Sequence, residues 1–295
     1  MILLEKLYLG SKVLQWLYKK SFLAKPLHKI SQFYYYLYFG FHKRRQFKEQ
    51  TKRLHGFVDS RYLSLRDLKG IYKGKRCFIT CTGPSLSIED LESLRNEYVF
   101  SMNSICLIHD MTNWKPDFYA IQDENVFGKV KNTLLATDNG QIFAPYDFFE
   151  LYNTPKDWVY FHCSWAYHLY DRKFRNIFYS LFSDNCYATV YDGFSVTYSI
   201  MQLAVYMGFD ELYLLGADCS YLGQRQHFIE HGHMTTMKDA LTATDRLLSS
   251  YSEAKKYADN HGVKIYNATR GGCLEIFQRV KLEDVIAVNK KNKLV

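Results

Sequence analysis

The chain has 295 residues, 47% hydrophobic and 23% charged, which suits one large α/β domain with an appendage or two modest domains and excludes wholesale disorder. Residues 1–55 hold 12 of the 38 Lys and Arg and two of the 30 Asp and Glu, so they carry a net charge of +10 and the remainder −2. A basic leader before a nearly neutral body argues against a protein whose main surface binds nucleic acid.

Residues 1–60 are the first predicted unit, a basic and aromatic helical segment. Glu5 and Lys6 interrupt the opening apolar run too early for a secretory signal, and the longest uncharged, histidine-free run, ISQFYYYLYFGF, has 12 residues, against the ~20 of a membrane-spanning helix. One helix face would carry Leu3, Leu7, Leu14 and Leu17. We expect this segment to lie on the anionic inner face of the cell membrane, with a helical hairpin packed on the domain, or a dimer interface, as the alternative.

Residues 61–295 are the second predicted unit, in which apolar runs alternate with amphipathic ones. Strands are expected within 76–83, 98–104, 117–123, 141–146, 158–164, 211–218 and 263–269. Helices are expected after Ser87, over 124–136, from Ser195 to Gly208 and over about 235–261. This alternation predicts a Rossmann-like α/β fold, a mostly parallel sheet with helices on both faces.

Small and polar residues follow the predicted strands, at the edge where such sheets bind ligands. They are Thr82–Gly83–Pro84–Ser85, Asn103–Ser104, Gln122–Asp123, Gly193–Ser195, Asp218–Tyr221 and Asn267–Arg270. The sequence contains neither G-x-G-x-x-G nor G-x-x-x-x-G-K-[ST], so a phosphate would instead meet the backbone N–H groups of TGPS before a helix. An ordinary tight turn is the alternative interpretation of these four residues.

The stretch HFIEHGHM, residues 227–234, contains three histidines and fits H-x-x-E-H, the spacing of zinc peptidases. That motif needs a continuous helix, whereas Gly232 and the preceding YLGQRQ favour a loop. We therefore expect no metal site here. A histidine that follows a parallel strand can instead act as a general base.

The seven cysteines are scattered, odd in number and without a C-x-x-C pair. They are predicted to be buried free thiols in a reducing compartment, in line with a cytoplasmic protein.

Several stretches occur in the order seen in one known family, over about residues 70–285. They are CTGPSL, SMNS, YDGFSVTYSIMQLAVYMGFDELYLLGADCSY, QHF and YNATRGGCLEIFQRV. The order resembles the 6-hydroxymethylpterin-diphosphokinase-like (MptE-like) domain family, many of whose bacterial members look like glycosyltransferases for surface polysaccharides such as lipopolysaccharide. It is more distantly similar to small bacterial sialyltransferases and motility-associated flagellin glycosyltransferases, which use CMP-activated nonulosonic acids.

The resemblance implies a nucleotide site without a bound cofactor. Its contacts would be Thr82, Gly83, Pro84, Ser85, Asn103, Gln122, Asp123, Gly193 and Ser195. Cys81 stands where the sialyltransferase motif has its first glycine, which leaves open how closely the backbone approaches the phosphates. The catalytic group would comprise His227 as base, His231 as the second candidate, Tyr221 at the leaving phosphate and Asp218 holding the loop.

These observations predict an inverting, metal-independent glycosyltransferase. It would move a sialic-type sugar from a CMP-sugar to a cell-surface glycan or lipid-linked acceptor, and whether it forms a homo-oligomer is open. One alternative is diphosphate transfer from ATP to a hydroxymethylpterin, with Mg²⁺ held by Asp123, Asp192 and Asp218. Another is a non-catalytic scaffold in polysaccharide assembly.

Overall fold

The computed structural model of the protein describes residues 21–220, 226–230 and 237–292, and the side chains of 29–220, 226–230 and 240–287. The chain divides into two compact units: one comprises the residues up to 48 with Trp165–Ile177, the other Glu49–Ser164 with the residues from Phe178 onward. No helix in the described part of the chain combines the length and apolar character that crossing a membrane requires. The leucine face expected over residues 3–17 lies outside the described residues.

The smaller unit is built from two helices, most of α3 (Ser21–Leu54) and α8 (Ala166–Arg175). Tyr35 and Phe39 are buried on one face of α3, where Tyr35 contacts Phe174 with ring centroids 5.5 Å apart. The ammonium of Lys173 lies 3.9 Å from the centre of the Tyr35 ring. Aromatic packing and a cation–π contact therefore hold α8 against this face of α3.

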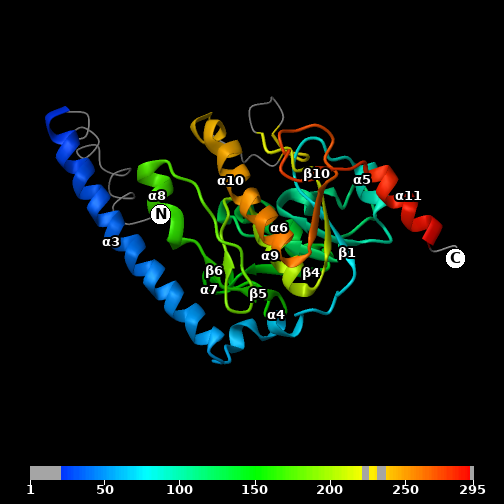
Figure 1. Ribbon diagram of the computed structural model, residues 1–295, viewed down its shortest axis with the longest axis horizontal. Helices are drawn as coiled ribbons and strands as arrows, with labels where there is room; N and C mark the ends of the chain where they lie inside the picture. The colour runs from blue at the N-terminus through cyan, green and yellow to red at the C-terminus, as the bar shows by residue number, and fades with distance from the viewer. Residues whose placement is uncertain (1–20, 221–225, 231–236, 293–295) are drawn as a thin grey trace. The chain divides into compact units, whose positions relative to one another are not determined.

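The larger unit contains an eight-stranded sheet in the order β10-β9-β8-β1-β2-β3-β4-β5, and every pairing in it is parallel (Figure 1). The strands are β1 (Arg76–Thr80), β2 (Tyr98–Met102), β3 (Phe118–Ala120), β4 (Gln141–Pro145), β5 (Val159–Phe161), β8 (Glu211–Leu215), β9 (Lys264–Asn267) and β10 (Gln278–Arg279). A two-stranded parallel sheet joins β6 (Cys163–Ser164) to β7 (Val190–Tyr191).

Helices fill the connections between strands. They are α4 (Leu63–Asp67), α5 (Ile88–Ser93), α6 (Glu124–Ala136), α7 (Tyr146–Tyr152), α9 (Val196–Met207), α10 (Met237–His261) and α11 (Leu282–Asn292), with 3₁₀ turns η1 (Ser60–Tyr62) and η2 (Asn103–Ile108). From β1 the chain builds the sheet toward β5, and from β8 it builds toward β10 on the other side. Because parallel crossovers are right-handed, these opposite directions place helices on both faces of the sheet.

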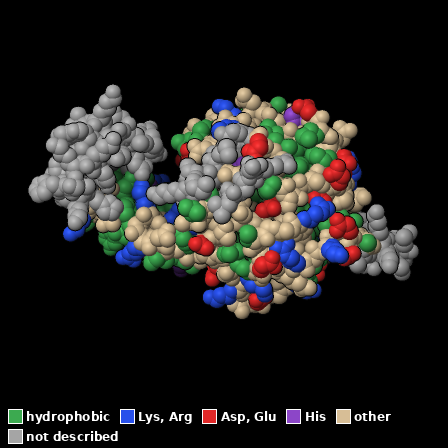
Figure 2. Space-filling view, turned by 90° about the horizontal axis from the view of Figure 1, so that it is seen from above, with side chains coloured by type: hydrophobic (Ala, Val, Ile, Leu, Met, Phe, Trp, Pro, Cys, Tyr) green, Lys and Arg blue, Asp and Glu red, His purple; other side chains and the backbone are tan. Residues whose placement is uncertain are grey.

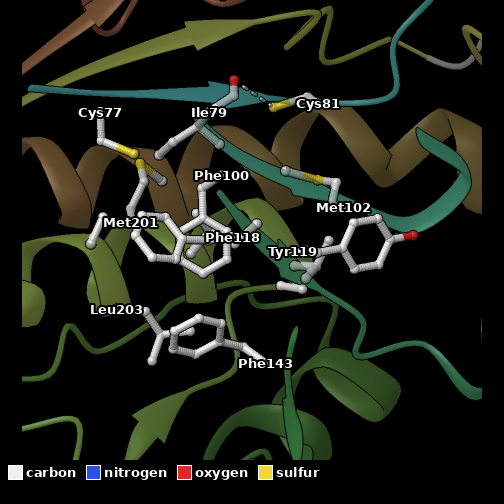
Figure 3. Packing of buried hydrophobic residues seen from close by; sticks show 14 of the residues in the cluster. Cys77, Ile79, Cys81, Phe100, Met102, Phe118, Tyr119, Phe143, Met201 and Leu203 are labelled. Carbon is white, nitrogen blue, oxygen red and sulfur yellow. Dashed lines mark hydrogen bonds between the residues drawn. The ribbon is translucent and has the colours of Figure 1, made fainter. Parts of the chain in front are cut away.

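Large apolar side chains fill the space under the central strands. Phe100 of β2, Phe118 of β3 and Phe143 of β4 contact one another, with ring centroids 5.0 Å apart for Phe100–Phe143 and 5.4 Å for Phe100–Phe118. Figure 3 shows these rings beside Met201 and Leu203 of α9. All five side chains are buried, so α9 is fixed against the middle of the sheet by the hydrophobic effect.

The predicted fold class is confirmed, and local signals located several elements well. Residues 124–136 form α6 as expected, and Ser87 and Asp90 form the capping box that starts α5. Gly208 ends α9 with a φ of 104°, a conformation that glycine adopts without strain. The expectation of buried cysteines is wrong at one position, because Cys273 is exposed, while the other six are buried or half-buried.

Candidate functional site

The end of β1 lies beside the end of β8. Strands that follow β1 in the chain add to one side of this pair, and strands that follow β8 add to the other side. Thr80 is paired with Leu215, and the loops after the two strands leave the same edge of the sheet. In open α/β sheets this reversal of direction opens a crevice between neighbouring loops, which is where ligands bind. The predicted residues Gly83 and Asp218 both lie here, although they come from opposite halves of the domain.

The loop Thr82–Ser85 packs directly against the loop after β8. The backbone N–H of Gly83 donates to the carbonyl of Gly216 at 2.9 Å. A Cβ atom on Gly83 would lie 2.0 Å from Asp218 Oδ2 and 2.3 Å from the Gly216 carbonyl oxygen, so no other residue fits. Ser85 Oγ donates to Asp218 Oδ2 at 2.8 Å, so Asp218 holds the loop after β1.

Cys81, which stands in place of a glycine, turns its side chain away from this loop. Its Sγ lies 3.5 Å from Thr197 Oγ1 in the first turn of α9, and Thr197 Oγ1 in turn donates to Met102 Sδ at 3.4 Å. Burial raises the pKa of the Cys81 thiol to about 12, so the thiol stays neutral. Cys81 thus packs the N-terminus of α9 onto the ends of β1 and β2, and the half-buried residues 82–85 form the accessible part of the loop.

The backbone after Asp218 is held by the turn that follows β9. The N–H of Cys273 donates to the Asp218 carbonyl at 2.8 Å, and a Cβ on Gly272 would come within 2.8 Å of the Asp218 backbone. Cys219 has a φ of 56°, which is strained for a residue other than glycine. Asp218 thus holds two other loops, the one after β1 and the one after β9, against its own.

The first part of the histidine stretch is attached to the end of β1. The N–H of Phe228 donates to the carbonyl of Thr82 at 2.7 Å, which brings His227 next to the predicted phosphate loop. Glu230 Oε1 accepts the N–H groups of Gln226 and His227 at 3.1 and 3.2 Å and closes a tight turn.

Residues 226–230 form bends rather than a helix, which argues against the zinc-peptidase geometry. His227 is only 8% exposed. Tyr221 and His231 lie outside the described residues. Among the residues that are described, no three His, Cys, Asp or Glu side chains gather as a metal-binding group.

Asn103 follows β2 in a left-handed conformation, with a φ of 52°. Its carbonyl accepts a hydrogen bond from the buried hydroxyl of Tyr119, which holds the residue in place. Its side-chain Oδ1 is buried and has no hydrogen-bond partner within the described part of the chain. A buried acceptor without a partner costs free energy unless a ligand supplies a donor, so Asn103 is suited to ligand contact.

Gln122 and Asp123, after β3, have other roles in the structure. Gln122 Oε1 accepts from Ser199 Oγ at 2.6 Å and its Nε2 donates to Asp192 Oδ1 at 3.1 Å, so this side chain links β3 to α9 and to the turn before it. Asp123 is exposed and caps α6 by accepting the N–H groups of Asn125 and Val126. Gln122 therefore joins β3 to α9, and Asp123 caps its own helix.

The N-terminus of α9 lies next to the end of β1, where Thr197 contacts Cys81. Ser195 is its N-cap and accepts the N–H of Thr197 at 3.2 Å. The residue before it, Phe194, has a φ of 68°, and a Cβ on Gly193 would lie 2.1 Å from the ring of Tyr198, so the approach to the helix is tightly constrained. A helix of 12 residues directs its positive end and its first N–H groups toward an anion.

Tyr251 of α10 is a site residue that the sequence did not indicate. Burial raises the pKa of its hydroxyl well above the ordinary value, and Thr197 and Ser195 nearby oppose this shift in part. The hydroxyl therefore stays neutral beside the first turn of α9. In sequence, a tyrosine on a long amphipathic helix is indistinguishable from a core residue, so no signal could have identified it.

Comparison with known proteins gives a family and two distant structural relatives. The profile of the family described as 6-hydroxymethylpterin diphosphokinase MptE-like matches residues 51–224. No match was found among curated proteins. The MAf glycosyltransferase from Magnetospirillum magneticum AMB-1 is 14% identical, with a TM-score of 0.44 over 78% of this chain and 40% of that protein. The sialyltransferase CstII from Campylobacter jejuni, in complex with cytidine-5′-monophosphate, is 15% identical, with a TM-score of 0.40 over 70% of this chain and 85% of that protein.

Proposed function

The chain belongs to the 6-hydroxymethylpterin diphosphokinase MptE-like family, and we propose that it is a glycosyltransferase that uses a nucleotide-activated sugar. The observation that carries this proposal is the hydrogen bond between Phe228 and Thr82, which joins a candidate base to a candidate phosphate loop at the switch point of the sheet. Transfer of a sugar from a nucleotide to a hydroxyl requires both a base and a site for the phosphate.

The phosphate of the donor would lie between the loop Gly83–Ser85 and the first turn of α9. Gly83 lets this loop pack tightly against Gly216 and Asp218. The N-terminus of α9 offers N–H groups and the positive end of its dipole. Such fixed donors stabilise the charge that develops on a departing phosphate without reorganising. Asn103 would contact the nucleoside or the sugar through its buried Oδ1.

In the proposed reaction His227 takes the proton from an acceptor hydroxyl as the oxygen attacks the anomeric carbon. The oxygen attacks from the face opposite the nucleotide, and the bond between the carbon and the phosphate oxygen breaks with its electron pair leaving on the nucleotide. The configuration at the carbon therefore inverts. We favour a CMP-linked sialic-type sugar as donor and a lipid-linked or cell-surface glycan as acceptor, on the cytoplasmic side of the membrane. CMP carries one phosphate, which protein donors alone can stabilise.

The family description names a diphosphokinase, which makes ATP-dependent diphosphate transfer the second candidate. Three carboxylates could serve a magnesium ion in that reaction. Each of them accepts hydrogen bonds from the protein: Asp123 caps α6, Asp192 binds Gln122 and Asp218 binds Ser85. These roles are structural, and they favour the glycosyltransferase.

A thermal-shift screen of the full chain tests the proposal. CMP and CTP should raise the melting temperature without added metal, because a ligand that binds only the folded state stabilises it. Stabilisation by ATP that requires Mg²⁺, with no response to cytidine nucleotides, would instead support the diphosphokinase. Asn103→Ala should reduce the response to CMP, whereas Asp123→Asn, at the exposed helix cap, should leave it unchanged.

A further inference from the structure

One face of α3 in the smaller unit carries large apolar side chains that are exposed. Ile30, Phe33, Leu37 and Phe41 are 65%, 63%, 54% and 65% exposed. They are spaced three and four residues apart, so they form one continuous row along the helix. Over 11 residues this row is about 17 Å long, at a rise of about 1.5 Å per residue.

The opposite face of the same helix is already covered. Tyr35 and Phe39 point to α8, where Tyr35 contacts Phe174 and Phe39 contacts Trp165. Gln46 Oε1 accepts the N–H of Ala166 at 3.1 Å and fixes the start of α8. The helix therefore has one face packed on its own unit and one apolar face directed outward.

Basic side chains continue the outward face toward the C-terminal half of the helix. Arg44 and Lys48 follow Phe41 at three and seven positions, on the same side, and Lys43 and Arg45 flank them. All four are exposed. Figure 2 shows hydrophobic and basic side chains next to one another on the visible part of this unit. The outward face is thus apolar over 30–41 and mainly cationic over 43–48, where Phe47, 67% exposed, adds one further apolar side chain.

We propose that this face binds the surface of an anionic lipid bilayer. The row Ile30–Phe41 would enter the boundary between headgroups and acyl chains, about 5–10 Å deep. Lys43, Arg44 and Lys48 would contact lipid phosphates, since basic residues near an anionic surface are attracted to it. The helix would lie at a tilt, with its apolar half deeper than its cationic half. This inference depends on the smaller unit alone and not on the transfer reaction.

Charge favours the bilayer over other occupants. A second copy bound in parallel through the same face would set its cations against those of its partner, which is unfavourable. A copy bound antiparallel, with one apolar row on the other, would leave the cations of both copies outside the contact and without an anionic partner. Residues 1–20 of this chain carry four lysines and one glutamate, so they offer no complement to the cationic half. An anionic bilayer matches both halves at once.

The test is flotation of the full chain with vesicles of phosphatidylcholine alone or with 30% phosphatidylglycerol. Wild type should float with the anionic vesicles. The variant Phe33→Gln, Leu37→Gln, Phe41→Gln should lose about a hundredfold in partitioning to them, because it removes the inserted area. In the variant Lys43→Gln, Arg44→Gln, Lys48→Gln, partitioning to the vesicles with phosphatidylglycerol should fall about a hundredfold, to the level seen with phosphatidylcholine alone.

The matched control replaces three exposed apolar residues of the larger unit, Ile71, Leu135 and Leu151, by Gln, and it should float like wild type. Equal flotation of wild type and the Phe33, Leu37, Phe41 variant would overturn the proposal. A dimer in gel filtration that this variant converts to a monomer would also overturn it, in favour of a second copy. The CMP thermal shift should be the same in every variant, so a failure here is distinguishable from a failure of the proposed function.

Discussion

The two ends of the parallel strands in the central sheet are built differently; we call the side where the strands begin the amino edge and the side where they end the carboxyl edge. At the amino edge, Arg76 at the start of β1 donates to both oxygens of Glu97 at 2.7 and 2.9 Å, and Tyr72 stacks on Phe209 with centroids 4.7 Å apart. At the carboxyl edge, the backbone is left-handed at Asn103, Phe194 and Cys219. One edge is packed and paired, whereas the other holds Phe194 and Cys219 in a conformation that is strained for these residue types.

The strained residues outside the crevice have an ordinary explanation. Asn153 and Asn176 are the only other non-glycine residues with positive φ in the described part of the chain, and they terminate α7 and α8. Asparagine is common at such helix ends. Phe194 and Cys219 have no such preference, so surrounding contacts must hold them in place. Strain at the carboxyl edge is therefore expected to serve binding, and pairing at the amino edge to serve stability.

Removing the candidate base should give the largest effect. His227→Ala should lower kcat by about 10²–10⁴-fold, because no group remains to take the proton of the acceptor hydroxyl. The thermal shift produced by CMP should change little. Steady-state kinetics with a CMP-sugar and a panel of acceptors measures the first quantity.

The control for that variant is His55→Ala, at an exposed position after α3, which should keep full activity. Unchanged turnover in His227→Ala would remove His227 from the reaction and make His231 the next candidate. Loss of folding in His227→Ala would be visible as a lower melting temperature without nucleotide.

A methyl group at position 83 should damage the crevice itself. Gly83→Ala places Cβ within 2.3 Å of Asp218 Oδ2 and of the Gly216 carbonyl, so the loop must move. We expect the free energy of unfolding to fall by about 1–3 kcal/mol. Affinity for CMP should fall by about tenfold or more, or about 1.4 kcal/mol. Denaturant titration and calorimetric binding measure the two effects.

Gly128→Ala is the matched control for position 83. Gly128 lies inside α6 with no atom within 4 Å of an added Cβ. Alanine should stabilise that helix by about 0.5–1 kcal/mol and leave CMP affinity unchanged. Equal behaviour of the two alanine variants would show that the loop at Gly83 is not held tightly.

A substitution at the amino edge should change the stability of the fold and leave activity and nucleotide binding unchanged. Arg76→Gln removes a bidentate pair whose side chains are 18% and 9% exposed and leaves Glu97 without its cation. We expect a loss of about 1–3 kcal/mol in unfolding free energy, with kcat and CMP affinity unchanged. Arg66→Gln, in a pair that is 46% and 67% exposed, should cost about 0–1 kcal/mol. Reduced CMP affinity in Arg76→Gln would contradict the division between the two edges.

Much of the contrast between the two ends of the strands could be predicted from the sequence, because it depends on local signals. Ser195 and Gly208 start and end α9 as the sequence predicts, and the polar residues after the apolar runs follow the strands at their carboxyl ends. The pairing of β1 with β8 could not be predicted, since it is set by tertiary packing between distant segments. The left-handed backbone of Phe194 and the place of Tyr251 beside α9 were also missed, because neither residue type signals these features.

The smallest expected effect concerns Asp117, at the start of β3 on the amino edge. Although the residue as a whole is exposed, the neighbouring protein removes part of the water around its carboxyl group and raises the pKa of that group, while the hydrogen bond from the Val99 N–H, 2.9 Å from Oδ2, lowers the pKa in part. The folded state therefore binds its proton more tightly than the unfolded chain, in which aspartate has a pKa of about 3.9. This contribution to stability is fully present below that value and is lost as the pH rises through the raised pKa.

Asp117→Asn replaces the carboxyl group with a neutral amide that can still accept from Val99. The variant and wild type should have similar melting temperatures near pH 3, and the variant should become the more stable of the two as the pH rises toward neutrality. A gap that instead widens on acidification would mean that the Asp117 carboxylate is favoured by its surroundings. A residue at the amino edge would then stabilise a negative charge, as binding sites do, which would contradict the proposed difference between the two edges at Asp117.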